Sequence, residues 1–206
     1  AELIRQHNNA NILCLPARFI DLETAVAWAC AIERKDGPSL LALSRQNLPR
    51  LLSNASDSEK VRKGAYILSD MPGAKVILIA TGSETSLAML AQAKLLAQGI
   101  ATRVVSMPCS NIFDRQSQDY QDSILPLHIP AVAIEAAHPD FWRKYVGRTG
   151  HVIGIASFGE SAPAPHLYQH FGITVERVEE AVKSLVKKAE TALVNSIPDQ
   201  IIRSVN

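Results

Sequence analysis

The chain has 206 residues, of which 47% are hydrophobic, so it can bury a substantial core and is not a disordered polypeptide. Its 21 Lys and Arg against 20 Asp and Glu give a net charge of +1, which excludes a global basic field for nucleic acid. The longest apolar runs, such as 76–80, have the length of a strand and predict no membrane-spanning helix.

Three cysteines, Cys14, Cys30 and Cys109, lie within or beside apolar sequence and show no CxxC spacing. This pattern favours buried free thiols over disulfides or a zinc site. We therefore expect no bound metal and a cytoplasmic location.

Residues 1–50 predict a partial α/β segment. Short apolar strands are expected at 11–15 and 39–44, with a helix from Leu22 to Arg34 between them. Asp21 is the expected helix cap. The resulting β–α–β unit implies parallel strands.

The stretch 46–63 loses hydrophobic periodicity and gains Asn, Ser, Asp and Lys, so we predict a linker without a core of its own and place it at 51–63. From residue 64 a second α/β pattern begins, which we extend to residue 190. The expected fold is a Rossmann-like, three-layer αβα domain with a mostly parallel sheet. Its predicted strands are 66–69, 75–80, 102–107, 131–135 and 152–156, with helices at 83–98 and from 175, the latter capped by Thr174. Residues 191–206 form a predicted C-terminal extension.

A turn motif, Ser157-Phe-Gly-Glu-Ser-Ala-Pro-Ala164, follows the last predicted strand. We expect Ser161 to cap the next helix and a proline to fall in its first turn. The motif resembles the last strand–helix junction of transketolase. Seven further segments resemble that family in the same order: Glu23-Thr-Ala-Val-Ala-Trp28, Glu33-Arg-Lys-Asp-Gly-Pro38, Leu43-Ser-Arg-Gln-Asn-Leu-Pro49, Ile79-Ala-Thr-Gly-Ser-Glu84, Arg103-Val-Val-Ser-Met-Pro108, Ala133-Ile-Glu-Ala136 and Phe141-Trp-Arg-Lys-Tyr-Val-Gly147.

The resemblance implies the C-terminal part of an enzyme that moves two-carbon ketol units between sugar phosphates in the pentose phosphate pathway. The complete enzyme uses thiamine diphosphate and Mg²⁺. The family's Gly-Asp-Gly…Asn and Gly-Pro-Thr-His motifs do not occur in this chain, so we expect it to bind no cofactor and to be inactive alone. The resemblance also implies a homodimer or a complementing subunit, with no nucleic acid or membrane partner. The alternative is a non-catalytic module for dimerisation or for binding a small effector.

Arg45 is the leading candidate for substrate binding, with Ser44 beside it. It follows the predicted strand 39–44, at the end where open α/β sheets hold ligands, and a guanidinium can grip phosphate through two parallel hydrogen bonds. From the residues alone, a structural ion pair is favoured. The family resemblance implies a role for Arg45 in binding the phosphate of the sugar. No catalytic residue is predicted.

Residues 1–21 fit transketolase poorly and resemble ribose-5-phosphate isomerase of the B type. His7, Asn8 and Arg18 fall on positions that in that family assist ring opening and contact substrate. Pro16 stands where a glycine is usual. This start is interpreted as a fusion relic, and the alternative is a divergent transketolase helix and strand.

Other polar motifs favour structural roles. The turns at 82–84 and 159–161 have the form of anion sites at helix starts, but Glu84 itself occupies the first turn. His166 and His170 are four residues apart on a predicted helix, where a solvated face is favoured over metal ligands. Glu135 ends a predicted strand, with a ligand or an interface as equal alternatives.

Overall fold

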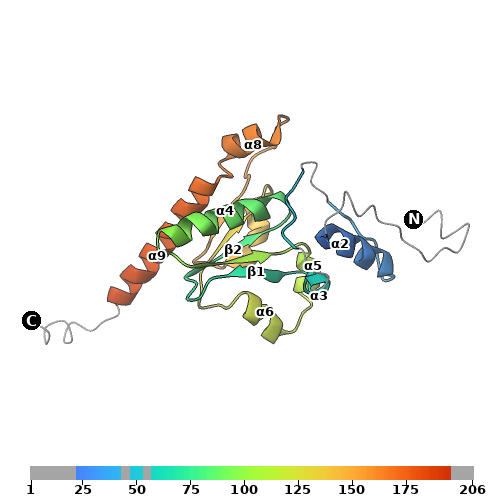
Figure 1. The fold of residues 1–206 in the computed structure, drawn as a ribbon, viewed down its shortest axis with the longest axis horizontal. Coiled ribbons are helices and arrows are strands. Elements are labelled where there is room, and N and C mark those ends of the chain that lie inside the picture. The colour runs from blue at the N-terminus through green and yellow to red at the C-terminus, as the bar shows by residue number, and fades with distance from the viewer. Residues whose placement is uncertain (1–21, 43–46, 53–56, 196–206) are drawn as a thin grey trace, which may run out of the picture.

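The computed structural model describes residues 22–42, 47–52 and 57–195. One sheet lies between two layers of helices, and helix α2 lies to one side of these layers beside α3 (Figure 1). The sheet has the strand order β1-β3-β2-β4-β5, in which β1 is antiparallel to β3 and the other pairs are parallel. Its strands are β1 (Tyr66–Asp70), β2 (Val76–Ala80), β3 (Thr102–Ser106), β4 (Ala131–Ile134) and β5 (His151–Ile153). The predicted α/β fold with a mostly parallel sheet is confirmed.

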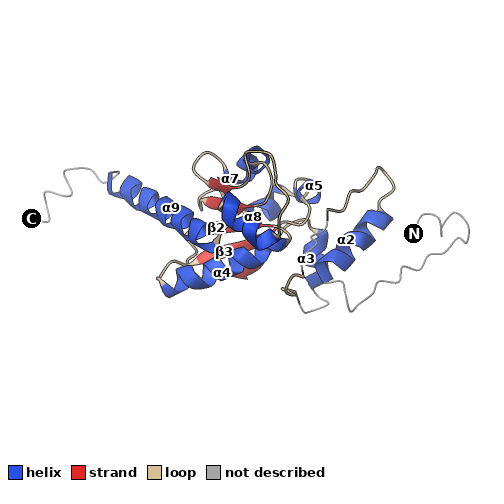
Figure 2. Cartoon of the chain, turned by 90° about the horizontal axis from the view of Figure 1, so that it is seen from above, coloured by secondary structure: helices blue, strands red, loops and turns tan. Residues whose placement is uncertain are grey.

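Helices cover both faces of the sheet, as the view from above also shows (Figure 2). The helices are α2 (Leu22–Glu33), α3 (Ser58–Arg62), α4 (Ser83–Ala97), α5 (Ser110–Phe113), α6 (Gln118–Ile124), the 3₁₀ helix η2 (Pro139–Trp142), α7 (Arg143–Val146), α8 (Ala164–Phe171) and α9 (Val175–Asn195). Strand β2 is central and buried throughout, so its sequence is apolar without alternation. Val76, Leu78 and Ala80 pack with α4 and α9, whereas Ile77 and Ile79 pack with α5, α6, η2 and α7.

Segment 22–42 differs in part from its prediction. Helix α2 is confirmed, with Val26 buried, but residues 39–42 form no strand, and the exposed fraction of Leu40 is 93%. A strand needs a neighbour to pair its backbone groups, and no described strand lies alongside this segment. Residues 43 and 44, the predicted strand at 11–15 and the Asp21 cap lie outside the described residues.

The predicted linker contains a short helix, α3, which the loss of periodicity did not indicate. Val61 of α3 is buried against Val26 of α2 and Tyr66 of β1. Arg62 of α3 also forms an ion pair with Glu33 of α2, at 2.9 Å between Nη1 and Oε2. This stretch is therefore more than a bare connection, because α3 packs between α2 and the sheet.

Strand β5 ends earlier than predicted, and helix α8 begins later. A Cβ atom at Gly154 would lie 2.7 Å from the carbonyl oxygen of Ala137, where the chain after β4 turns tightly, so ladder pairing stops at Ile153. Ser161 does not cap α8. Pro163 is the N-cap residue, because the helix begins at Ala164, and a proline does occupy its first turn. Thr174 caps α9 as predicted, with its Oγ1 accepting from the Arg177 amide at 3.3 Å.

Candidate functional site

The carboxyl end of the sheet is where this fold places a ligand. From β2 the chain crosses through α4 to β3 on one side, and from β3 it returns to β4 on the other. The strand order therefore reverses between β2 and β4, and open α/β sheets bind ligands outside such a reversal. Polar side chains follow all three strands there: Ser83 and Glu84 after β2, Ser106 at the end of β3, and Glu135 after β4.

Glu84 is held in place by two hydroxyl groups. The chain leaves β2 through Gly82, whose φ of 54° lies in a region that favours glycine, and enters α4 with Glu84 in the first turn. Ser83 Oγ donates to Glu84 Oε2 at 3.0 Å, and the Tyr168 hydroxyl donates to Oε1 at 2.8 Å. The side chain of Glu84 is thus almost fully buried yet hydrogen-bonded, at the positive end of a helix dipole.

Tyr168 belongs to α8, so it connects the far end of the chain to this turn. Its hydroxyl oxygen also lies 2.7 Å from Ser83 Oγ. Burial, together with the hydrogen bond to the Glu84 carboxylate, raises the pKa of Tyr168 to about 12. The phenol therefore stays protonated and acts as a donor. Since 84 residues separate Tyr168 from Glu84, no local sequence signal predicts this pairing.

Glu135 is the least satisfied group at this edge. Its Oε2 atom is buried and has no hydrogen-bond partner among the described residues. Burial, with a smaller contribution from the nearby Glu84 carboxylate, raises the pKa of Glu135 to about 8. This carboxyl group is mostly protonated at neutral pH, so it can donate a hydrogen bond or transfer a proton.

Helix α2 reaches the same edge of the sheet. Ser106 Oγ donates to Glu23 Oε1 at 2.8 Å, across 83 residues of sequence. The motif that begins at Glu23 in the sequence therefore lies against the end of β3, close to the reversal of strand order. This contact was not predicted, because Glu23 reads from sequence only as an acidic residue in a first helical turn.

None of the residues predicted to bind substrate is described by the structure. Arg45 and Ser44 lie outside the described residues, and so do His7, Asn8 and Arg18. Their roles in phosphate binding and in an isomerase-like site stay predictions. The turn 159–161 is exposed and starts no helix.

The histidines of α8 are surface groups. Both His166 and His170 are exposed, and His170 faces Glu160 at 3.6 Å, which confirms the predicted solvated face. Across 22–42, 47–52 and 57–195, no three His, Cys, Asp or Glu side chains are grouped to hold a metal ion. None of the helices in these ranges combines the length and hydropathy that a bilayer crossing requires.

Comparison with known proteins identifies the family. Residues 64–174, more than half of the chain, match the model of the transketolase-like C-terminal domain. Transketolase 1 of Vibrio vulnificus is 52% identical over 167 residues, covering 80% of this chain and 25% of the relative.

Solved transketolases share the fold. The enzyme of Leishmania mexicana superposes with a TM-score of 0.74 at 42% identity, covering 81% of this chain and 24% of that one. The enzyme of Pichia stipitis in complex with sedoheptulose-7-phosphate superposes with the same score of 0.74 at 40% identity, covering 82% and 24%. The chain spans about a quarter of the length of the relatives it matches. It belongs to the transketolase family and corresponds to the C-terminal portion of those enzymes.

Proposed function

We propose that this chain supplies the C-terminal part of a transketolase, which transfers two-carbon ketol units between sugar phosphates when joined to the domains that bind thiamine diphosphate. The 52% identity to a transketolase over 167 residues carries this proposal. A related structure in complex with sedoheptulose-7-phosphate supports sugar phosphates as the substrates. A cytoplasmic location, and assembly as a homodimer or with a complementing subunit, belong to the same proposal.

The cofactor is assigned to other parts of the enzyme. Thiamine diphosphate supplies the carbanion chemistry when bound, and its diphosphate is held through Mg²⁺. The donor set of the described residues does not fit that group, since they contain no cluster of metal-ligating side chains. The carboxyl groups of Glu84 and Glu135 are buried, and Glu84 is already hydrogen-bonded. We therefore expect no ketol transfer by this chain alone.

Arg45, with Ser44, is the proposed contact to the substrate phosphate. Helix α2 precedes this segment and is tied to the carboxyl end of β3 through the hydrogen bond between Ser106 and Glu23. The proposal also divides the chain into four parts. They are a partial α/β segment at 1–50, a linker at 51–63, a C-terminal domain at 64–190 and an extension at 191–206.

Complementation tests the proposed function. The chain is mixed with a separately expressed N-terminal part of the Vibrio vulnificus transketolase that stops where the similarity begins. We expect ketol transfer from a ketose phosphate, dependent on thiamine diphosphate and Mg²⁺, in the mixture and in neither part alone. Stable association without activity contradicts the enzyme assignment and supports the module. Activity of the isolated chain contradicts the cofactor assignment.

Substitution of Arg45 tests the phosphate contact in the active mixture. Arg45→Ala is expected to raise KM for a phosphorylated acceptor by about 10- to 100-fold, because a charge-assisted hydrogen-bond pair is lost. KM for an acceptor without phosphate should not change. Arg50→Ala, a nearby arginine, is the control. An equal effect of Arg45→Ala on both acceptors contradicts the assignment.

A further inference from the structure

The open edge of the sheet carries a basic depression far from the reversal of strand order. Within the part of the chain that the structure describes, β5 pairs only with β4 and forms an edge of the sheet. Beside it lies a hollow of about 570 Å³. It is lined by Pro139, Arg143, Lys144, Val146, Gly147, Arg148, Gly150, His151 and Val152. Four of these residues are basic and none is acidic.

Two of the basic side chains are already neutralised at the rim. Arg143 Nε lies 2.8 Å from Asp140 Oδ1, and Lys144 Nζ lies 2.7 Å from Asp114 Oδ2. Arg148 differs, because its guanidinium makes no ion pair or hydrogen bond with any residue that the structure describes. It is therefore the cation lining this hollow that no carboxylate of the described residues neutralises.

The backbone around Arg148 is tightly defined. Helix α7 ends at Gly147, whose φ of 64° favours glycine. A Cβ atom at Gly150 would lie 2.4 Å from the carbonyl oxygen of Val146 and 2.5 Å from that of Ala131. Two glycines thus bracket Arg148 in the short connection from α7 to β5, which fixes the backbone from which its side chain extends.

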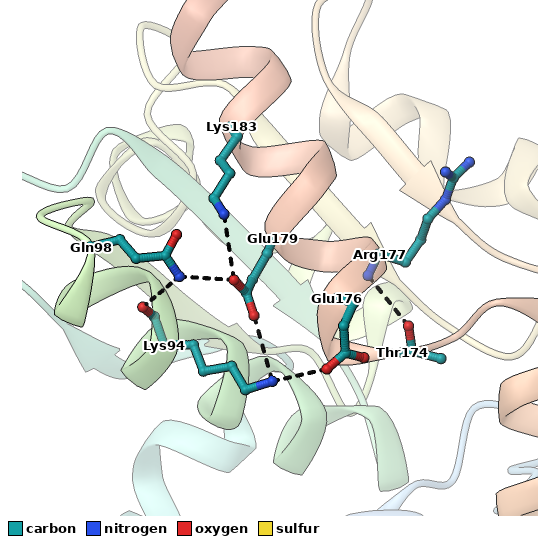
Figure 3. Close-up of polar contacts among 7 residues, drawn as sticks. All are labelled: Lys94, Gln98, Thr174, Glu176, Arg177, Glu179 and Lys183. Carbon is teal, nitrogen blue, oxygen red and sulfur yellow. Dashed lines mark hydrogen bonds and ion pairs between the residues drawn. The ribbon is translucent and has the colours of Figure 1, made fainter.

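Positive charge also reaches this edge from α9. Partial burial, followed by the charges of Arg177 and Lys188, lowers the pKa of His151. Figure 3 shows the Arg177 side chain directed away from Lys94 and the ion pairs between α4 and α9. Burial is the main cause of this lowered pKa, and the two cations of α9 add to it.

We propose that this depression binds the phosphate group of a small phosphorylated molecule, with Arg148 as its main ligand. A planar guanidinium with unused donors matches a phosphate through paired hydrogen bonds. Lys188 adds positive charge near His151, whereas Arg143, Lys144 and Arg177 are paired with Asp140, Asp114 and Glu180. The proposed site uses none of the residues predicted to bind substrate, so it does not depend on the transketolase assignment.

The competing role of these charges is protection of the sheet edge, since charged side chains and short strands prevent edge-to-edge pairing. The two roles predict different results. Charged side chains that only protect the sheet edge would change self-association and would show no saturable affinity for anions. A phosphate site binds anions and depends on one particular arginine.

The first experiment titrates the full chain with inorganic pyrophosphate at constant ionic strength and follows backbone amide signals by NMR. We expect saturable shifts confined to residues 147–152 and a dissociation constant about tenfold larger for Arg148→Gln. Arg115→Gln, which removes the same charge elsewhere, is the control. Equal weakening by both variants, or shifts spread over the surface, overturns the proposal. The same variants are also tested for binding to vesicles that contain phosphatidylglycerol. If the chain binds these vesicles through Arg148 but does not bind pyrophosphate, the proposal is overturned.

The second experiment uses sulfate, whose charge is constant over the range studied. Of the side-chain types at this edge, only histidine has a reference pKa between about 5.5 and 7.5. The surrounding charged groups are Arg143, Lys144, Arg148, Arg177 and Lys188, with the carboxylates Asp114, Asp140 and Glu180. Sulfate affinity should rise as pH falls, because His151 gains a proton. His151→Gln should remove this rise and His138→Gln should keep it. A rise that is unchanged in His151→Gln contradicts a site at this edge.

Discussion

The Tyr168 hydroxyl donates to Glu84 Oε1 at 2.8 Å and so ties α8 to the first turn of α4. Helix α8 contains no fully buried residue, and this part-buried hydrogen bond adds to the packing of Tyr168 and Phe171 on the core. The same bond stabilises a buried carboxylate that has only one other side-chain donor, Ser83.

Tyr168→Phe is expected to lower the free energy of unfolding by about 1–3 kcal/mol, because a buried carboxylate loses a donor. Urea denaturation measures the change. Tyr145→Phe is a matched control, since its hydroxyl contacts the exposed Asp114 and should matter less. Equal losses in the two variants would contradict the role of the Glu84 contact.

Glu135 should make stability fall as pH rises. Its pKa is raised from an ordinary 4.5 to about 8 by burial and by Glu84, so the folded state holds more protons than the unfolded state between these values. The contribution of this proton to the free energy of unfolding is fully present below about pH 4.5 and is lost as pH rises through about 8. Over that range the free energy of unfolding falls by at most about 1.4 kcal/mol per pH unit. Glu135→Gln should remove this slope in denaturation curves measured across the range, and the exposed Glu160→Gln should retain it. A slope that persists in Glu135→Gln refutes the assignment.

Two glycines with positive φ should respond differently to alanine. Gly64 has a φ of 85°, and a Cβ there would lie 2.4 Å from the Cys109 carbonyl oxygen and 2.5 Å from the Phe113 amide nitrogen. Gly73 has a φ of 73° with open space around it. Gly73→Ala should therefore cost about 1 kcal/mol of backbone strain, and Gly64→Ala at least about 3 kcal/mol. Thermal and urea unfolding measure both, and similar losses would count against the close packing.

Phe158 is expected to matter for assembly and not for folding. Its exposed fraction is 97%, in the loop between β5 and α8. Phe158→Ala should change the free energy of unfolding by less than about 0.5 kcal/mol and weaken association with the N-terminal part in the complementation assay. Leu127→Ala, 95% exposed elsewhere, is the control. Unchanged association in Phe158→Ala removes this loop from the interface.

Much of the fold follows from local patterns. Strands β1 to β4 match their predicted ranges to within one residue at each end. Strands β2 and β4 are apolar throughout, and β1 and β3 have apolar residues at 66–68 and 104–105. Helix α9 follows in the same way, with its Thr174 cap and its apolar stripe of Val178, Val182 and Leu185. These features depend only on residues close together in sequence.

The predictions fail where contacts between residues far apart in the sequence determine the structure. Residues 39–42 have the composition of a strand but no described neighbour to pair with. Strand β5 stops at Ile153 where the chain after β4 turns tightly against Gly154, which no pattern within β5 predicts. At the candidate site, Glu84 and Glu135 were visible as strand-end carboxylates. The hydroxyl partner of Glu84 from Tyr168, and the burial that raises the pKa of Glu135, depend on the three-dimensional arrangement.

The hydrogen bond between Ser106 and Glu23, with Val26 packed on Tyr66, has a practical consequence for anyone dissecting this protein. The region that matches the family model begins at residue 64, yet a fragment cut there would lose the cover of Tyr66 and the partner of Ser106. The region that the family model matches thus leaves out α2, which packs on it. Expression of the domain for study should start before α2.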